Sequence, residues 1–219
     1  YAVGKTVEEL RTGAVNESGK AADADLASSA TIYLGGYVAA IEQAVANAQH
    51  LGAQAGDKLN LAVITGIGDS KAATAENAGN AQLNVDATAL TMNGETITSC
   101  VIDAVQAKVE FDAAGTVTTD LTAPIQTKNE LGENYGMVAW GGAIAEWDEQ
   151  AAALASFAVG KTVEELKSGA IDETGKAPAG SDLATQATIY LGGYVSAIEK
   201  AVANAAHLGA QAGDTLKLA

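Results

Sequence analysis

Cysteine, proline, aromatic residues and positive charge are all scarce in this chain. It has one cysteine, two prolines and 5% aromatic residues among 219 positions. The single cysteine, Cys100, excludes a disulfide within the chain and a metal cluster built from the chain's own cysteines. The 12 Lys and Arg residues are scattered among 27 Asp and Glu, so the net charge is −15. Such a charge repels phosphate backbones and anionic headgroups, and we expect no nucleic acid partner.

Long apolar runs are missing too. Gly or charged residues interrupt every hydrophobic stretch well before the roughly 20 residues that a membrane-spanning helix needs. We therefore expect no direct membrane insertion in this segment. Hydrophobic residues still make up 48% of the chain, enough to bury a substantial core. The acidic composition, rich in Ala, Gly and Thr, is typical of exported bacterial proteins and predicts an extracellular or cell-surface location. The chain opens within a pattern at Tyr1, and we interpret it as part of a longer polypeptide.

Two long segments of the chain resemble each other. Residues 1–62 and 157–219 align almost throughout, "YAVGKTVEELRTGAVNESGK" with "FAVGKTVEELKSGAIDETGK" and "HLGAQAGDKLNLA" with "HLGAQAGDTLKLA". In both copies, Thr-Val-Glu-Glu forms a capping box that predicts a helix start, at Thr6 and at Thr162. A longer helix follows in each copy, with one apolar stripe: Tyr37, Ile41, Ala44, Val45 and Ala48 in the first, Tyr194, Ile198, Ala201, Val202 and Ala205 in the second.

The segment between the two copies has a different pattern. Residues 82–120 alternate apolar with polar side chains and are rich in Val, Ile and Thr, which predicts half-buried strands. Turn signals at Asn93-Gly94 and at 112–115 make this an antiparallel meander. Residues 124–134 read as a loop. A helix is expected next, with one apolar face made by Ile144, Trp147, Ala151, Leu154 and Phe157.

These patterns predict an α+β fold, an antiparallel β-sheet covered on one face by helices, within a tandem-repeat protein. Residues 1–62 are interpreted as the C-terminal helical part of a preceding repeat unit. Residues 63–219 are interpreted as a complete unit, with strands mainly in 63–123 and helices mainly in 143–219. Alternatively, the two helical copies compete for the single sheet, which would favour exchange between chains and self-association through residues 1–62.

The residues also carry a resemblance to a known family. The strand pair "NGETITSCVID", the run "EWDEQAAALASFAVGKT" and the pattern Asp-x-x-Ser/Thr-x-Ala-Thr together resemble the FMN-binding domain family. That family includes flavinylated extracellular lipoproteins of Gram-positive bacteria and the C subunit of the sodium-pumping NADH:quinone reductase. The resemblance covers residues 80–219 as one domain and residues 1–62 as the end of another.

This resemblance implies a covalent cofactor. In the family, a flavin transferase joins the last Thr of the motif to the phosphate of FMN, and the domain then carries electrons from a membrane redox donor. The implied acceptors are Thr31 and Thr188. The other motif residues implied at the cofactor site are Asp25, Ser28, Ser29 and Ala30 in the first copy, and Asp182, Thr185 and Ala187 in the second.

Physical arguments support two roles for the hydroxyls of that motif, phosphate attachment and plain helix capping. A hydroxyl at the start of a helix would place a phosphate near free amides and the positive end of the helix dipole. The same hydroxyls, in Ser28, Ser29, Thr185 and Thr188, would also serve as plain helix caps. The family's Gly before Ala-Thr is Ser29 in one copy and Gln186 in the other. If that position needs a positive φ angle, both copies are compromised, and the Gln side chain would also crowd a phosphate.

Other residues carry weaker signals. His50 and His207 fall at equivalent helix ends, where a cation is favoured by the dipole. Cys100 is interpreted as a small buried hydrophobe in a strand. Trp147 falls on the helix stripe and is expected in the core, whereas Trp140 lies beside Gly in a loop. Tyr33 and Tyr190 either border a ring system or simply pack.

Two functions are consistent with the sequence. The first is an extracellular electron-transfer module with FMN esterified to Thr31 or Thr188. The second is a non-catalytic, tandem-repeat surface protein without flavin, serving in spacing, adhesion or self-assembly. Neither makes the chain an enzyme in its own right, because in the first the cofactor supplies the redox chemistry and the protein supplies its position.

Overall fold

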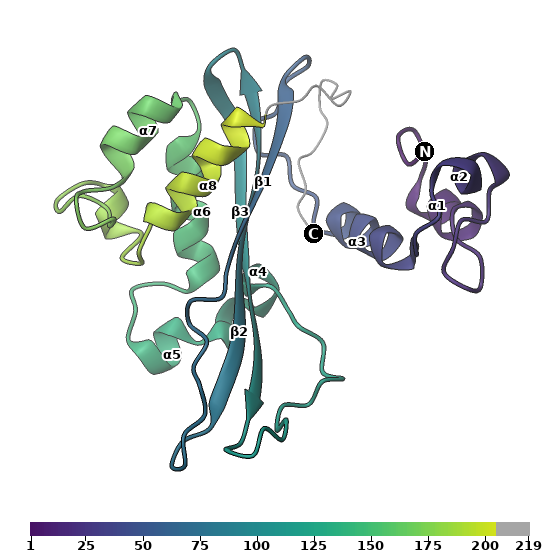
Figure 1. Cartoon of the computed structure of the whole chain (residues 1–219). Helices are drawn as coiled ribbons and strands as arrows, with labels where there is room; N and C mark the ends of the chain where they lie inside the picture. Colours follow the sequence, from purple (N-terminus) through teal and green to yellow (C-terminus); the bar gives the residue numbers. More distant parts are fainter. Residues whose placement is uncertain (205–219) are drawn as a thin grey trace. The chain divides into compact units, whose positions relative to one another are not determined.

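The computed structural model describes residues 1–204 (Figure 1). Within them, the chain divides into two compact units, and the division lies between Gln49 and His50. We call residues 1–49 unit 1 and residues 50–204 unit 2. The last residues of the first similar segment, from His50 to Ala62, therefore belong to unit 2, where they supply the beginning of the sheet.

Unit 1 consists of three helices, α1 (Val7–Gly13), α2 (Ala24–Ser29) and α3 (Gly35–Ala46). The predicted capping box at Thr6 is present, with the Thr6 hydroxyl accepting from the Glu9 amide. Helices α1 and α3 pack together, and Arg11 of α1 forms a 3.0 Å ion pair with Glu42 of α3. Leu10 and Ala14 are buried between the helices, whereas no residue of α3 is fully buried.

Unit 2 is built on a three-stranded antiparallel sheet in the order β1-β2-β3. The strands are β1 (Lys58–Gly66), β2 (Gly79–Asn93) and β3 (Thr96–Phe111). The predicted turn at Asn93-Gly94 joins β2 to β3, with Gly94 at a φ of 60°. The second predicted turn follows β3. The residues on its two sides are paired by an isolated bridge between Phe111 and Val117 and not by a further strand. The hairpin predicted at Asn93-Gly94 is confirmed, whereas the strand expected after the turn at 112–115 is not formed, and the third strand of the sheet is instead β1, which precedes the strand region predicted at residues 82–120.

The helices of unit 2 follow the strands. They are α4 (Lys128–Leu131), the 3₁₀ helix η1 (Gly132–Tyr135), α5 (Met137–Gly141), α6 (Trp147–Ala158), α7 (Val163–Ala170), the 3₁₀ helix η2 (Leu183–Thr185) and α8 (Gly192–Ala203). Helix α6 packs on β3, and α8 packs on β2 and β1 (Figure 1). The expected loop at 124–134 was a wrong prediction, because a capping box between Thr127 and Glu130 starts α4 there. The last part of the predicted helical region, 205–219, lies outside the described residues.

The core of unit 2 lies between the sheet and its helices. Alternate strand residues such as Leu90 and Ile102 point toward this layer, where they meet Trp147, Leu154 and Ile198, all at most 3% exposed. Strand residues of the other parity include Leu61, half exposed at 50%, and Leu83 at 41%. The predicted α+β fold, with helices on one face of an antiparallel sheet, is therefore what the structure shows.

Candidate functional site

Thr188 lies in a loop and not at the start of a helix. It follows η2, and α8 begins only at Gly192, with Leu191 in the N-cap position. The Thr188 side chain is exposed. The expectation that this threonine opens a helix is therefore wrong, because residues 188–191 form the connection between η2 and α8.

A buried glutamine of α6 fixes this loop. Gln150 is 0% exposed, and its Oε1 accepts hydrogen bonds from the amide of Thr188 at 2.8 Å and from that of Ile189 at 3.2 Å. The Thr188 hydroxyl lies 3.4 Å from the same oxygen. The Gln150 Nε2 donates to the carbonyl of Ala145 at 2.8 Å, which fixes the orientation of the amide group. The loop backbone is thus tied to α6 while the hydroxyl that it carries remains at the surface.

The amides of Leu191 and Gly192, where α8 begins, are already used. Leu191 N and Gly192 N both donate to the carbonyl of Gly175, at 2.8 and 3.1 Å. The Tyr190 ring lies against the same backbone, since a Cβ added at Gly175 would come within 2.2 Å of the ring and one at Gly192 within 2.6 Å of its hydroxyl. Tyr190 therefore packs on glycine backbone, and the phosphate site expected at a helix start is not formed by these amides.

Thr31 has a different setting in unit 1. It comes directly after Ala30, the C-cap residue of α2, and before α3, which begins at Gly35. Its side chain is exposed, like that of Thr188. The helix end that precedes Thr31 carries the negative pole of its dipole, which does not favour a phosphate. Among hydrogen bonds between the described residues, no side chain holds the Thr31 amide as Gln150 holds that of Thr188.

The other hydroxyls of the motif donate backward along the chain. Ser28 donates to Asp25 O at 2.7 Å, Ser29 to Leu26 O at 3.2 Å, and Thr185 to Asp182 O at 2.7 Å. They do not cap a helix start, and the plain capping prediction is therefore wrong for these three residues. The cap of α2 is the carboxylate of Asp23, which accepts from Leu26 N at 2.9 Å.

The position of the family's glycine has ordinary backbone geometry. Gln186 has a φ of −115°, and no non-glycine residue in the described chain has a positive φ. Ser29 and Gln186 are therefore compatible with this backbone. The Gln186 side chain bonds back to Asp182 O at 3.3 Å and does not reach over Thr188. The neighbouring alanines differ, since Ala187 is buried at 1% exposure and Ala30 is half-buried, whereas Asp25 and Asp182 are both exposed.

A second cluster was not foreseen from the sequence. Lys128 of α4 is 8% exposed, and its Nζ lies 4.7 Å from the ring centre of Tyr135 and 5.0 Å from that of Trp147. The indole of Trp147 donates to the Tyr194 hydroxyl at 3.0 Å, and burial raises the pKa of Tyr194 to about 12. Burial also raises the pKa of Asp86, an effect that Lys128 partly offsets. The caged cation thus joins α4 to η1 and α6, and the bond between Trp147 and Tyr194 joins α6 to α8.

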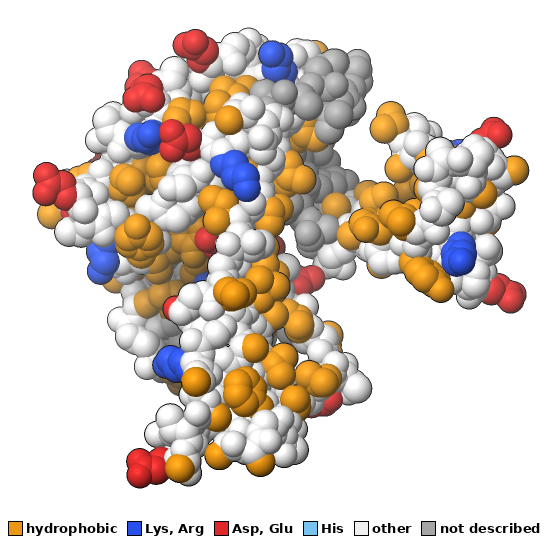
Figure 2. All heavy atoms as spheres, viewed as in Figure 1, with side chains coloured by type: hydrophobic (Ala, Val, Ile, Leu, Met, Phe, Trp, Pro, Cys, Tyr) orange, Lys and Arg blue, Asp and Glu red, His pale blue; other side chains and the backbone are white. Residues whose placement is uncertain are grey.

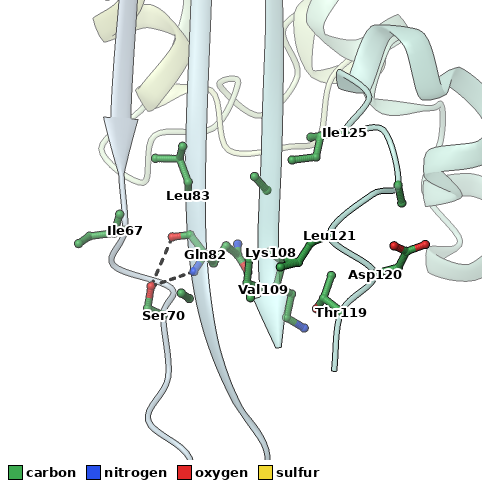
Figure 3. Close-up of a pocket in the computed structure, with 13 residues that line it drawn as sticks. Ile67, Ser70, Gln82, Leu83, Lys108, Val109, Thr119, Asp120, Leu121 and Ile125 are labelled. Carbon is green, nitrogen blue, oxygen red and sulfur yellow. Dashed lines mark hydrogen bonds between the residues drawn. The ribbon is translucent and has the colours of Figure 1, made fainter. Parts of the chain in front are cut away.

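A groove opens at the end of the sheet away from this cluster (Figure 3). Its volume of about 370 Å³ is at the lower end of the range for small-molecule sites. Its two charged groups are engaged elsewhere: Lys108 pairs with Glu110 at 2.6 Å, and Asp120 accepts from the Thr122 hydroxyl at 2.7 Å. The groove is thus an apolar surface without reactive chemistry of its own. It is lined mainly by Ile67, Ala81, Leu83, Ala107, Val109, Leu121 and Ile125.

The remaining sequence candidates are placed as follows. Cys100 is buried at 4% exposure, as expected of a small hydrophobe, and burial raises its pKa to about 12. Trp147 lies in the core as predicted, whereas Trp140 lies in α5 and not in the expected loop, and it is 84% exposed. His50 follows α3, and His207 lies outside the described residues. Within residues 1–204, no group of three or more His, Cys, Asp or Glu is placed to hold a metal ion. None of the helices in that range has the length and apolar character to cross a membrane.

Comparisons with protein-family models, with curated proteins and with solved structures find no match to this chain.

Proposed function

We propose that this chain is a carrier of covalently bound FMN, attached through the hydroxyl of Thr188 or of Thr31, which passes electrons on the outside of a bacterial cell. The observation that carries the proposal is the exposed Thr188 hydroxyl on a loop whose backbone is held by the buried Gln150. A group that must be modified by another enzyme needs to be accessible, and a carrier needs its attachment point to be held in place.

The residues present fit an attachment point. The Thr188 hydroxyl would carry the phosphate of FMN as an ester, and it lies at the surface where a flavin transferase has access. Gln150 would keep the loop in the same position before and after modification, because its contacts involve the two loop amides and leave the hydroxyl lone pairs available. When bound, FMN supplies the one- and two-electron redox chemistry that the side chains lack. The proposed partners are the flavin transferase and a membrane redox donor.

Intact mass and visible absorption test this proposal. The full chain is produced together with a bacterial flavin transferase, and a mass excess of one or two FMN groups with a yellow colour is expected. Thr188→Ala should remove one of these groups, and Thr31→Ala should remove the second where two are attached. Ser196→Ala is the matched control, because it removes an exposed hydroxyl of α8 where unit 1 already has Ala39. A colourless chain of unmodified mass, also when isolated from its own organism, would refute the proposal.

A second candidate function is a flavin-free repeat module that serves in spacing or self-assembly. The observation that favours it is the apolar face of α3, whose counterpart in α8 is buried while α3 buries no residue completely. The two candidates differ in the mass experiment, since only the carrier requires modified threonines.

A further inference from the structure

Helices α3 and α8 are nearly the same helix in two settings. Gly35–Ala46 reads GGYVAAIEQAVA, and Gly192–Ala203 reads GGYVSAIEKAVA. The sequences differ only where Ala39 corresponds to Ser196 and Gln43 to Lys200. Ser196 and Lys200 are both exposed in α8. Every residue that α8 buries therefore has an identical counterpart in α3.

The burial of these identical residues differs sharply. In α8, which packs on β1 and β2, Ala197, Ile198 and Ala201 are each 0% exposed. Their counterparts in α3 are Ala40, which is exposed, and Ile41 and Ala44, which are only half-buried. Tyr37 is 61% exposed, and hydrophobic side chains are visible on the surface of unit 1 in Figure 2.

The support behind the two helices is conserved within the chain. Leu10 of α1 is 3% exposed behind α3, as Leu166 of α7 is 0% exposed behind α8. An ion pair crosses each helix pair at the same place, Arg11 to Glu42 at 3.0 Å and Lys167 to Glu199 at 2.9 Å. Unit 1 is thus a preformed copy of the α7–α8 pair whose sheet-facing side is uncovered by the described residues of its own unit.

We infer that α3 is a second sheet-covering helix, and that the surface it covers is the β1–β2 face of a second copy of this chain, taken in place of that copy's α8. The face is known to accept this pattern of side chains, because α8 presents the same Tyr, Val, Ala and Ile residues to it. Reciprocal exchange between two copies closes a symmetric dimer, in which each sheet is covered by the other copy's α3.

Two effects favour α8 in the intact chain. It belongs to the same chain as the sheet that it covers, and such a tether corresponds to an effective concentration on the order of millimolar. Its Lys200 also donates to the carbonyl of Val63 at 2.7 Å, where α3 has the shorter Gln43. The wild-type chain is therefore expected to be mainly monomeric at micromolar concentration, and weakening α8 alone should reveal the exchange.

The experiment weakens each helix separately in the full chain. Ile198→Asp places a charge on the buried face of α8, and Ile41→Asp makes the same change on α3. Sedimentation velocity and urea unfolding are measured at several protein concentrations. Ile198→Asp should dimerise with a dissociation constant at least about tenfold below that of wild type, and its unfolding midpoint should rise with concentration. Ile41→Asp alone should behave as wild-type monomer.

The double variant decides the matter. With both helices weakened, the chain should be monomeric, and its unfolding midpoint should be lower than that of Ile198→Asp at high concentration. An Ile198→Asp chain that stays monomeric at every concentration, or a double variant that dimerises equally well, would overturn the second copy as the occupant. Should Ile198→Asp not fold even at high concentration, the milder pair Ile198→Ala and Ile41→Ala/Ile198→Ala is measured in its place, and the same outcomes support or overturn the inference. None of these readouts depends on flavin.

Discussion

At the scale of single residues, Gln150 is the side chain that gives the candidate site its shape. One buried amide accepts from two consecutive loop amides and donates to Ala145, so α6 determines where Thr188 lies. The threonine itself makes only a long contact of 3.4 Å through its hydroxyl. The reactive group of the site is therefore the Thr188 hydroxyl, and its position is set by Gln150 of α6.

Replacing Gln150 should destabilise unit 2. Gln150→Leu leaves the Ala145 carbonyl and two loop amides without their partner, and a loss of about 1–2 kcal/mol in the free energy of unfolding is expected. Urea denaturation followed by circular dichroism measures it. Gln186→Leu is the matched control, because Gln186 is exposed and makes a single 3.3 Å bond to Asp182 O, and it should change stability by less than about 0.5 kcal/mol. Equal losses in the two variants would contradict this account of the loop.

Cys100 should make stability depend on pH at the alkaline end. Burial raises its pKa from 9.0 to about 12, so the folded chain keeps the thiol proton that the unfolded chain loses. The stabilising contribution is complete below pH 9.0 and declines as the pH rises toward 12, by about 1.4 kcal/mol per pH unit. Unfolding free energies measured at pH 8 to 11 should therefore fall more steeply for wild type than for Cys100→Ala. Parallel curves would show that the thiol titrates freely in the folded state.

At the scale of elements, the long β2–β3 hairpin depends on its turn. Asn93 pairs with Thr96, which leaves Gly94 and Glu95 as the two central residues. A glycine with positive φ at the first central position is the arrangement of type II′ turns, whose twist matches that of the flanking strands. The Asn-Gly signal thus located the hairpin, although Asn93 itself ends β2.

Gly94→Ala should weaken the hairpin through backbone strain alone. A Cβ at Gly94 meets no atom within 4 Å, but the residue has a φ of 60°, which costs about 1–2 kcal/mol for an L-amino acid with a side chain. Gly66→Ala is the control, because its Cβ also meets nothing within 4 Å and its φ is not positive. Urea unfolding should show a loss for Gly94→Ala and little or no loss for Gly66→Ala. A similar loss in both would point to packing instead of φ.

Element assignment also shows where local signals were incomplete. The capping box at Thr127 starts α4 in a segment that reads as a loop, because a helix as short as Lys128–Leu131 has no room for an apolar stripe. The position of α4 matters, since it carries Lys128 under the rings of Tyr135 and Trp147. Because these contacts join residues from different elements, a periodic pattern in the sequence does not predict them.

At the scale of the whole molecule, the two units differ in how large a hydrophobic core they bury. Unit 2 has a sheet, two covering helices and an extended core. In unit 1, by contrast, the buried hydrophobic residues are Leu10 of α1 and Ala14, the residue that follows α1. A small helical unit with so little buried area is marginally stable by itself.

Hydrogen exchange should separate the two units. The amides of α3 are expected to exchange at least about 100-fold faster than those of α8, because local opening of unit 1 costs much less free energy. Exchange measured by mass spectrometry gives this ratio directly. The comparison is internally controlled, since the two helices have nearly the same sequence and therefore nearly the same intrinsic exchange rates. Equal protection of α3 and α8 would mean that α3 is covered to the same extent as α8.

The sequence by itself determined the elements whose causes are local. Capping boxes at Thr6 and Thr162 start helices, the Asn93-Gly94 signal marks a hairpin, and alternation of apolar side chains predicts the strands. Each depends on residues within one turn or one strand of each other, and the α+β fold follows from their order. The helix stripe that places Trp147 in the core is of the same kind.

Tertiary structure alone decided what depends on contacts between distant segments. Thr188 precedes its helix because Gln150 and the Gly175 carbonyl hold the intervening loop. Most directly, α3 and α8 share their sequence but not their burial: Ile198 is 0% exposed and Ile41 is only half-buried. An apolar stripe specifies that a helix has a face to cover, whereas only the presence of a sheet at the right distance determines whether that face is covered.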